Sequence, residues 1–72
     1  MATPRTRLQL ASRLRRLRKE LKLTQEDMAE RSGLDYRDYQ RLESRKPLDS
    51  RLSTLEKVAK GFGIPLWKLF KF

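Results

Sequence analysis

The segment Thr24–Glu43, TQEDMAERSGLDYRDYQRLE, contains the signals that decide the fold. Thr24 is a favourable N-cap residue, and Asp27 three positions later completes the pattern of a capping box. Gly33 is expected to end this first short helix, because the residue after a helix often needs a positive φ that glycine adopts without strain. Asp35 then predicts a second N-cap. The segment therefore predicts two short helices joined by a tight turn.

A further helix is predicted ahead of this segment. Four leucines from Leu10 to Leu21 recur at the spacing of one helix face, so the helix is expected to run from about Arg7 to Leu21. A basic amphipathic helix can bind membranes or acidic partners, but a stripe this narrow and without aromatic residues favours packing against a core. Residues 1–7 have no apolar periodicity and are interpreted as a flexible arm, with an ordinary frayed terminus as the alternative.

Two more helices are predicted after the central segment. Residues 44–51 are polar and are expected to form a loop, because the proline inside it prevents simple continuation of the preceding helix. Asp49 or Ser50 is expected to cap the next helix, which would run to about residue 60 or 61, where glycines break the pattern. Residues 64–70 predict a last short helix with a proline near its first position. The predicted fold class is all-α with five helices.

The composition restricts the possible functions. The chain has 72 residues, which allows one small domain, and it contains no Cys and no His. It therefore lacks thiolate and imidazole metal ligands and the commonest general base, and we expect no enzyme, no metal, no cofactor and no small-molecule site. No apolar run approaches the roughly 20 residues of a membrane span, and no signal segment is evident, so a cytoplasmic location is expected.

The charge predicts a polyanionic partner, nucleic acid before membrane. The net charge is +9, of which residues 1–22 contribute +7, residues 23–50 contribute −2 and residues 51–72 contribute +4. The two central helices are therefore not the basic part of the chain. If the partner is DNA, non-specific attraction is expected from the flanks, and the central helices must act through a few placed side chains.

Two short helices that meet at a glycine-containing turn are typical of a helix-turn-helix, whose second helix enters the DNA major groove. Further motifs occur in order along the chain: Leu14–Arg18, Leu23–Ala29, Ser32–Leu34, Tyr39–Glu43, Thr54–Ala59, Phe62–Ile64 and Leu69–Phe70. With these motifs the chain resembles the phage-repressor and Cro-type helix-turn-helix family, the xenobiotic-response-element type. The resemblance implies a compact five-helix, lambda-repressor-like domain over residues 8–72 that binds specific sequences in double-stranded DNA.

The resemblance also implies roles for single residues. Gln25 would bind a DNA phosphate at the start of the second helix, since its amide can donate to phosphate while accepting from a neighbour. Tyr36, Arg37 and Arg41 would face the major groove, where an arginine can make the bidentate contact to guanine. The full set of expected DNA contacts is Thr24, Gln25, Tyr36, Arg37, Gln40, Arg41, Ser44, Arg45, Lys46 and Arg51.

Arg18 and Glu43 match a salt bridge that joins the first and third helices of the family. A cation would also offset the unfavourable position of Glu43 at a helix C-terminus, and two solvated charges are the alternative. The chain departs from the family pattern at Lys22 and Arg45, where the family often has glycine. Each is a helix end that tends to need a positive φ, so we expect about 1 kcal/mol of strain or an altered loop there. The 44–51 loop is also about one residue longer than the usual pattern.

The C-terminus predicts an apolar patch of Trp67, Phe70 and Phe72. Two copies could pair through it as a two-fold homodimer, which would set two recognition helices about one DNA turn apart. The alternative is that Trp67 folds back onto the first helix. The predicted function is a small prokaryotic or phage transcriptional regulator of repressor type that reads DNA with residues 36–43. The alternative function is an antitoxin or a protein-interaction module, which would use this patch and the acidic surface of the second helix.

Overall fold

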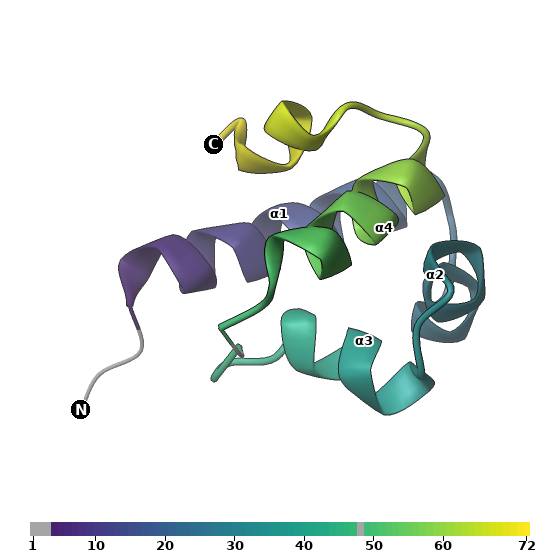
Figure 1. Ribbon diagram of the computed structural model, residues 1–72, viewed down its shortest axis with the longest axis horizontal. Coiled ribbons are helices and arrows are strands. Elements are labelled where there is room, and N and C mark those ends of the chain that lie inside the picture. The colour runs from purple at the N-terminus through teal and green to yellow at the C-terminus, as the bar shows by residue number, and fades with distance from the viewer. Residues whose placement is uncertain (1–3, 48) are drawn as a thin grey trace.

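The computed structural model describes residues 4–47 and 49–72, and this part of the chain forms four α-helices and one 3₁₀ helix (Figure 1). The elements in order are α1 (Arg5–Glu20), α2 (Gln25–Ser32), α3 (Tyr36–Leu42), α4 (Leu52–Phe62) and the 3₁₀ helix η1 (Leu66–Phe70). The all-α prediction is confirmed at the level of a compact helical domain. None of the helices in the described ranges is long and apolar enough to span a membrane.

The fifth predicted helix is a 3₁₀ helix rather than an α-helix. Element η1 follows Pro65, and the Lys68 N–H donates to the Pro65 carbonyl at 3.1 Å, three residues back, as in a 3₁₀ turn. A segment of five residues is too short to gain the cooperative bonds of an α-helix. It is held instead by packing, because it lies against α1 and α4 and buries Leu69.

Helix α1 begins at Arg5 rather than at the predicted Arg7. The Pro4 carbonyl accepts from the N–H groups of Arg7 and Leu8, so the first turn is already closed there. Residues 5–7 of the predicted arm are therefore helical, and residues 1–3 lie outside the described residues.

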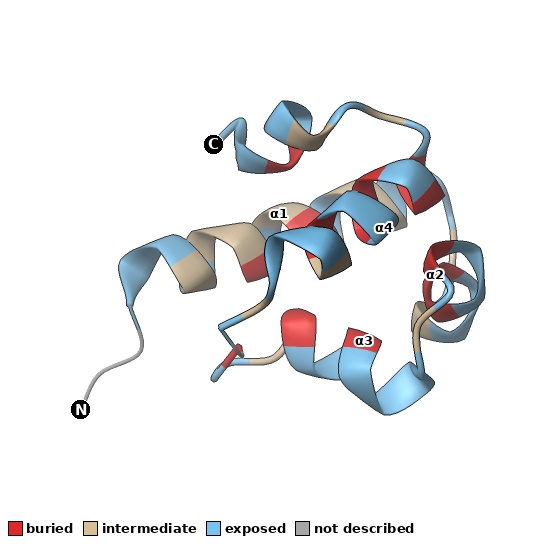
Figure 2. Ribbon diagram, viewed as in Figure 1, coloured by how far each residue is buried: buried red, intermediate tan, exposed pale blue. Residues whose placement is uncertain are grey.

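One face of each helix contributes to a single core (Figure 2). The apolar stripe predicted for α1 faces this core except at Leu21, which is 49% exposed because the helix ends at Glu20. The buried core residues are Leu14, Met28, Ala29, Tyr39, Leu42, Leu55, Val58, Ala59, Phe62 and Leu69. Each of the two central helices contributes two apolar residues to this set, so α2 and α3 are fixed to the rest of the domain by burial.

The two helix ends at which the family often has glycine differ from each other. Lys22, just after α1, has a φ of 56°, as predicted. Over the described ranges it is the one non-glycine residue with a positive φ, so Arg45 does not take the strained alternative. The chain bends through residues 44–46 instead, without a left-handed residue.

Helix α4 begins at Leu52, and its N-cap is Arg51, whose side chain makes no capping hydrogen bond. The predicted caps Asp49 and Ser50 therefore lie before the N-cap position. The carbonyl of Arg51 accepts from the Leu55 N–H, and Leu55 is the first buried residue of α4.

Gly61 lies inside α4, where the sequence predicted a break. Its carbonyl accepts from Arg31 Nε at 2.8 Å. A Cβ at this position would lie 2.7 Å from Ser32 Oγ and 3.2 Å from the Ser32 backbone N, so α2 and α4 approach each other closely here. Gly63 ends the helix instead, with a φ of 74°.

Replacing Gly61 by Ala tests this close approach. Alanine favours a helix interior by about 0.5–1 kcal/mol, but overpacking against Ser32 costs about 1–3 kcal/mol. We expect Gly61→Ala to lower the free energy of unfolding by about 1–2 kcal/mol in urea denaturation. Lys57→Ala on the exposed face of α4 is the control, with an expected change below about 0.5 kcal/mol. A Gly61→Ala protein as stable as the parent would contradict the close contact.

Candidate nucleic-acid interface

The predicted capping box at the start of α2 is present. Thr24 Oγ1 accepts from the Asp27 N–H at 3.0 Å, and Asp27 Oδ2 accepts from the Thr24 N–H at 2.9 Å. The bond from the Thr24 N–H, and after it the Thr24 side chain, lower the pKa of the Asp27 carboxyl, because donation to the carboxylate favours its charged form. Gly33 ends α2 with a φ of 68°, and the Leu34 N–H returns to the Ala29 carbonyl at 2.9 Å. The entry to α2 and its turn into α3 are thus set by local bonds.

Helix α3 is capped by Asp35, whose Oδ1 accepts from the Arg37 N–H at 3.0 Å. Two of its residues, Tyr39 and Leu42, are buried. The remaining side chains of the helix, which include four predicted DNA contacts, are exposed: Tyr36, Arg37, Asp38, Gln40 and Arg41. The helix therefore presents one polar surface away from the core.

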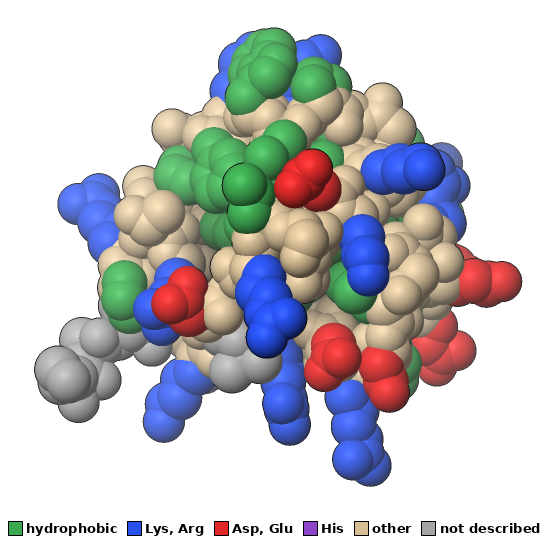
Figure 3. Space-filling model, in the orientation of Figure 1, with side chains coloured by type: hydrophobic (Ala, Val, Ile, Leu, Met, Phe, Trp, Pro, Cys, Tyr) green, Lys and Arg blue, Asp and Glu red, His purple; other side chains and the backbone are tan. Residues whose placement is uncertain are grey.

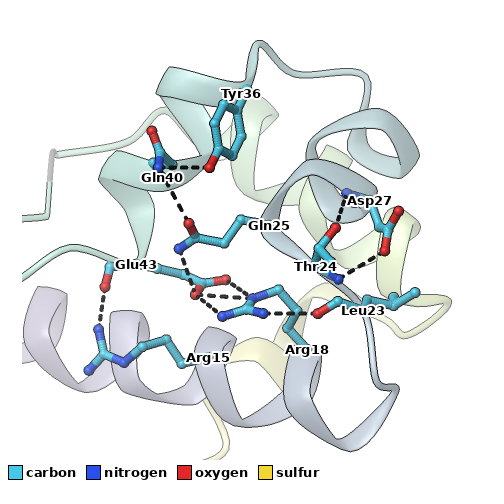
Figure 4. Close-up of polar contacts among 9 residues, drawn as sticks. All are labelled: Arg15, Arg18, Leu23, Thr24, Gln25, Asp27, Tyr36, Gln40 and Glu43. Carbon is cyan, nitrogen blue, oxygen red and sulfur yellow. Dashed lines mark hydrogen bonds and ion pairs between the residues drawn. The ribbon is translucent and has the colours of Figure 1, made fainter.

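Arg18 and Glu43 form the predicted ion pair between α1 and the end of α3 (Figure 4). Arg18 Nε lies 2.9 Å from Glu43 Oε2, and Arg18 Nη2 lies 3.0 Å from Glu43 Oε1. The third nitrogen, Nη1, donates to the Leu23 carbonyl at 2.9 Å. Glu43 is only 3% exposed, so the alternative of two solvated charges is wrong. The backbone carbonyl of Glu43 accepts a further bond from Arg15.

Both members of the pair stay charged. Burial raises the pKa of the Glu43 carboxyl, but hydrogen bonds from Arg18 and other neighbours outweigh burial and lower it. The hydrogen bond to Glu43 raises the pKa of Arg18. Tyr39 is buried beside the pair, and burial and the Glu43 carboxylate raise the pKa of its hydroxyl. That hydroxyl makes no hydrogen bond of standard geometry in the described part of the chain.

Gln25 connects this buried pair to the exposed surface of α3 (Figure 4). Its Nε2 donates to Glu43 Oε1 at 3.2 Å, and its Oε1 accepts from Gln40 Nε2 at 3.5 Å. The same Gln40 nitrogen donates to the Tyr36 hydroxyl at 3.0 Å. A chain of side-chain hydrogen bonds therefore runs from α1 through the first residue of α2 to the first residue of α3.

The predicted contacts after α3 are more dispersed. Ser44 Oγ donates to the Arg41 carbonyl at 2.9 Å and so closes the end of the helix. Arg45 and Lys46 are exposed just beyond it, and Arg51 is exposed at the N-cap of α4. Figure 3 shows Lys and Arg side chains that project from the lower edge of the molecule, the edge along which α3 runs in Figure 1.

Two shallow depressions lie on either side of the exposed surface of α3. One is lined by Thr24, Gln25 and Tyr36 together with Lys22, which sequence reasoning treated only as a helix end. Its position after α1 was the available signal, because it lies two residues before Thr24, the N-cap of α2. The other depression is lined by residues that include Asp38 and Arg51. A positively charged side chain therefore lies in each depression, Lys22 in one and Arg51 in the other.

Several basic residues serve the fold rather than a free surface. Arg13 donates to the Lys68 carbonyl from Nε at 3.2 Å and from Nη2 at 3.1 Å, which ties η1 to α1. Arg7 Nη2 pairs with Asp49 Oδ2 at 3.2 Å. Together with Arg18 and Arg31, these residues place part of the positive charge of the chain in tertiary contacts.

The three aromatic residues predicted as a patch are exposed at the C-terminus. Trp67 is 62% exposed, so the alternative in which it folds back onto α1 is wrong. Leu69 fills that part of the core instead. Phe70 and Phe72 make an edge contact with ring centroids 6.4 Å apart, and Lys68 Nζ lies 5.6 Å from the Trp67 ring centroid.

A family model described as a helix-turn-helix domain matches residues 11–71, which include the capped pair, α4 and η1. The chain belongs to this helix-turn-helix domain family. The resemblance to the phage-repressor and Cro-type members is confirmed, and the family implies DNA binding.

The helix-turn-helix domain is also similar to a solved structure. A crystal structure of a hypothetical transcription factor, NHTF, from Neisseria shares 30% sequence identity with it, with a TM-score of 0.84. The alignment covers 97% of this chain and 83% of that chain. A search of curated proteins finds no match.

Arg18→Ala tests the ion pair of the helix-turn-helix domain. Removing one member leaves the Glu43 carboxylate buried without its partner, which costs about 3–5 kcal/mol. We expect the melting temperature to fall by more than about 10 °C in a calorimetric scan. Arg16→Ala, at an exposed position of the same helix, is the matched control. An Arg18→Ala change no larger than that of Arg16→Ala would reject a structural role for the pair.

Proposed function

We propose that this helix-turn-helix domain binds specific sequences in double-stranded DNA as a small prokaryotic or phage transcriptional regulator of repressor type, acting in the cytoplasm. The observation that carries the proposal is the exposed surface of α3, which is oriented by hydrogen bonds to α2 and α1. The description of the similar Neisseria protein as a hypothetical transcription factor supports it.

In this proposal the exposed surface of α3 enters the major groove. Arg37 and Arg41 can each reach a guanine and make the bidentate contact to O6 and N7. Gln25, with one amide hydrogen not used by Glu43, donates to a phosphate at the groove edge. Because α3 is capped by Asp35 at its start and followed by the ion pair of Glu43 at its end, its side chains would meet the bases in one fixed position along the duplex.

Phosphate contacts come from the cations on either side of α3. Arg45, Lys46 and Arg51 follow the helix. Thr24 lies at the start of α2, and Ser44 lies just after the end of α3. Lys22 adds a cation to the depression beside Gln25. Because these contacts release counterions from DNA, binding is expected to weaken steeply with salt.

Arg37→Ala tests direct reading of bases. We expect a loss of about 1–3 kcal/mol on the specific duplex and little change on random-sequence DNA, measured by fluorescence anisotropy at fixed salt. Lys57→Ala removes one positive charge from the exposed face of α4 and serves as the control for net charge. Equal losses on both duplexes for Arg37→Ala would make Arg37 a phosphate contact.

The specific duplex is obtained by selection of bound sequences from random double-stranded DNA. We expect one sequence to be enriched over several rounds. A population that stays random while the protein remains folded would contradict sequence-specific binding.

We also propose a homodimer through the apolar patch of Trp67, Phe70 and Phe72. The support is that three aromatic side chains are exposed at the C-terminus, two of which, Phe70 and Phe72, contact each other. A two-fold pair of copies would bring two α3 helices to one DNA duplex. A protein-interaction module or an antitoxin would also use an exposed aromatic patch. Whether the patch binds a second copy of this chain or another protein therefore distinguishes these functions.

Sedimentation velocity at micromolar concentration tests the dimer. We expect a concentration-dependent dimer that is lost in Trp67→Ser, with Leu52→Ser, another exposed apolar residue, as the control. Monomers at all concentrations, with and without the specific duplex, would contradict the dimer. Recovery of another protein with the tagged chain after nuclease treatment would then favour the protein-interaction function.

A further inference from the structure

We propose that Gln40 is a positioning residue that presents the Tyr36 hydroxyl to DNA as a hydrogen-bond donor. The inference rests on the proposed DNA-binding function and specifies the chemistry that the first residue of α3 can recognise. It follows from the order of donors and acceptors in the hydrogen bonds that join Glu43, Gln25, Gln40 and Tyr36 (Figure 4).

The order starts at the buried Glu43 carboxylate. Arg18 donates to both of its oxygens, and an ionised carboxylate can only accept. Gln25 must therefore turn its amide nitrogen toward Glu43, which it does at 3.2 Å. Since the amide group is planar, its oxygen is then the atom that faces Gln40. The orientation of Gln25 is fixed by a charge in the interior.

The orientation of the Gln40 side-chain amide is set by Gln25. Facing an amide oxygen at 3.5 Å, it must present its own nitrogen, and this nitrogen also lies 3.0 Å from the Tyr36 hydroxyl. The two hydrogens of one amide nitrogen serve the two acceptors. Tyr36 and Gln40 are four residues apart on α3, the spacing at which helix side chains meet.

The Tyr36 hydroxyl therefore accepts from inside the protein, and its hydrogen is left to donate outward. Over the described residues that hydrogen has no protein acceptor, and the Tyr36 side chain is 40% exposed. Its partner on DNA must be an acceptor: a phosphate oxygen, guanine O6 or N7, adenine N7 or thymine O4. The exocyclic amine of cytosine, which only donates, is a poor partner for this donor.

A double-mutant cycle tests the coupling of the two side chains. Tyr36→Phe removes the hydroxyl, Gln40→Met removes the amide at similar length, and the double variant removes both. Dissociation constants are measured at fixed salt on the selected duplex and on a random-sequence duplex. We expect Tyr36→Phe to weaken binding of the selected duplex about 5- to 15-fold, as for one hydrogen bond, with no loss of melting temperature.

The effect of Gln40→Met is expected to depend on the hydroxyl. It should weaken binding about 3- to 10-fold when Tyr36 is present, but less than about 2-fold in the Tyr36→Phe protein. Equal losses in both backgrounds would overturn the positioning role, because a residue that only supports the helix acts with or without the hydroxyl. No loss on Tyr36→Phe would overturn the donor role.

The two duplexes separate the possible acceptors. A loss confined to the selected duplex assigns a base, and an equal loss on both duplexes assigns a phosphate; either supports the donor. If the parent protein binds neither duplex, or selection enriches no sequence, the proposed function itself fails. If the parent protein binds the selected duplex specifically but the losses of Tyr36→Phe and Gln40→Met simply add in the double variant, only the inference about Gln40 is overturned.

Discussion

The buried ion pair of Arg18 and Glu43 is the interaction on which the rest of the structure depends. The Glu43 carboxylate lies at the C-terminal end of α3, where burial and the helix dipole both disfavour a negative charge. Arg18 compensates for both by donating to the two oxygens of the carboxylate, and its third nitrogen bonds to the Leu23 carbonyl. Because Gln25 also bonds to this carboxylate, one charge orients the end of α3 and the start of α2.

The distribution of charge follows from this arrangement. In the proposed function, attraction to DNA depends on the cations around α3, because α2 and α3 carry few cations and Arg13 and Arg18 of α1 make tertiary contacts. The proposed specific contacts would then depend on geometry more than on charge, since a short helix with few arginines must place each one correctly. On the exposed part of α3, Gln40 bonds to Gln25 of α2 and to Tyr36 of the same helix, so these two side chains are restrained.

The sequence predicted features whose causes are local. The capping box of Thr24 and Asp27 and the left-handed turn at Gly33 depend on residues a few positions apart, and they were found where expected. Gly61 was misinterpreted as a helix break because its reason is the approach of α2, which lies far away in sequence. The bond between Gln25 and Gln40 was not predicted for the same reason, since it needs the crossing of two helices. The Arg18–Glu43 pair was predicted from the family resemblance, since its two members are also far apart in sequence.

The most direct test of whether the helix-turn-helix domain reads DNA through α3 is to follow backbone amide shifts in NMR spectra while a duplex is added. We expect the largest shifts at the start of α2 and along α3, with smaller shifts in the loop that follows. We also expect the shifts to saturate with the selected duplex and to remain small with a random-sequence duplex at the same salt. Largest shifts on the outer face of α1 or at η1, equal for both duplexes, would contradict reading through α3.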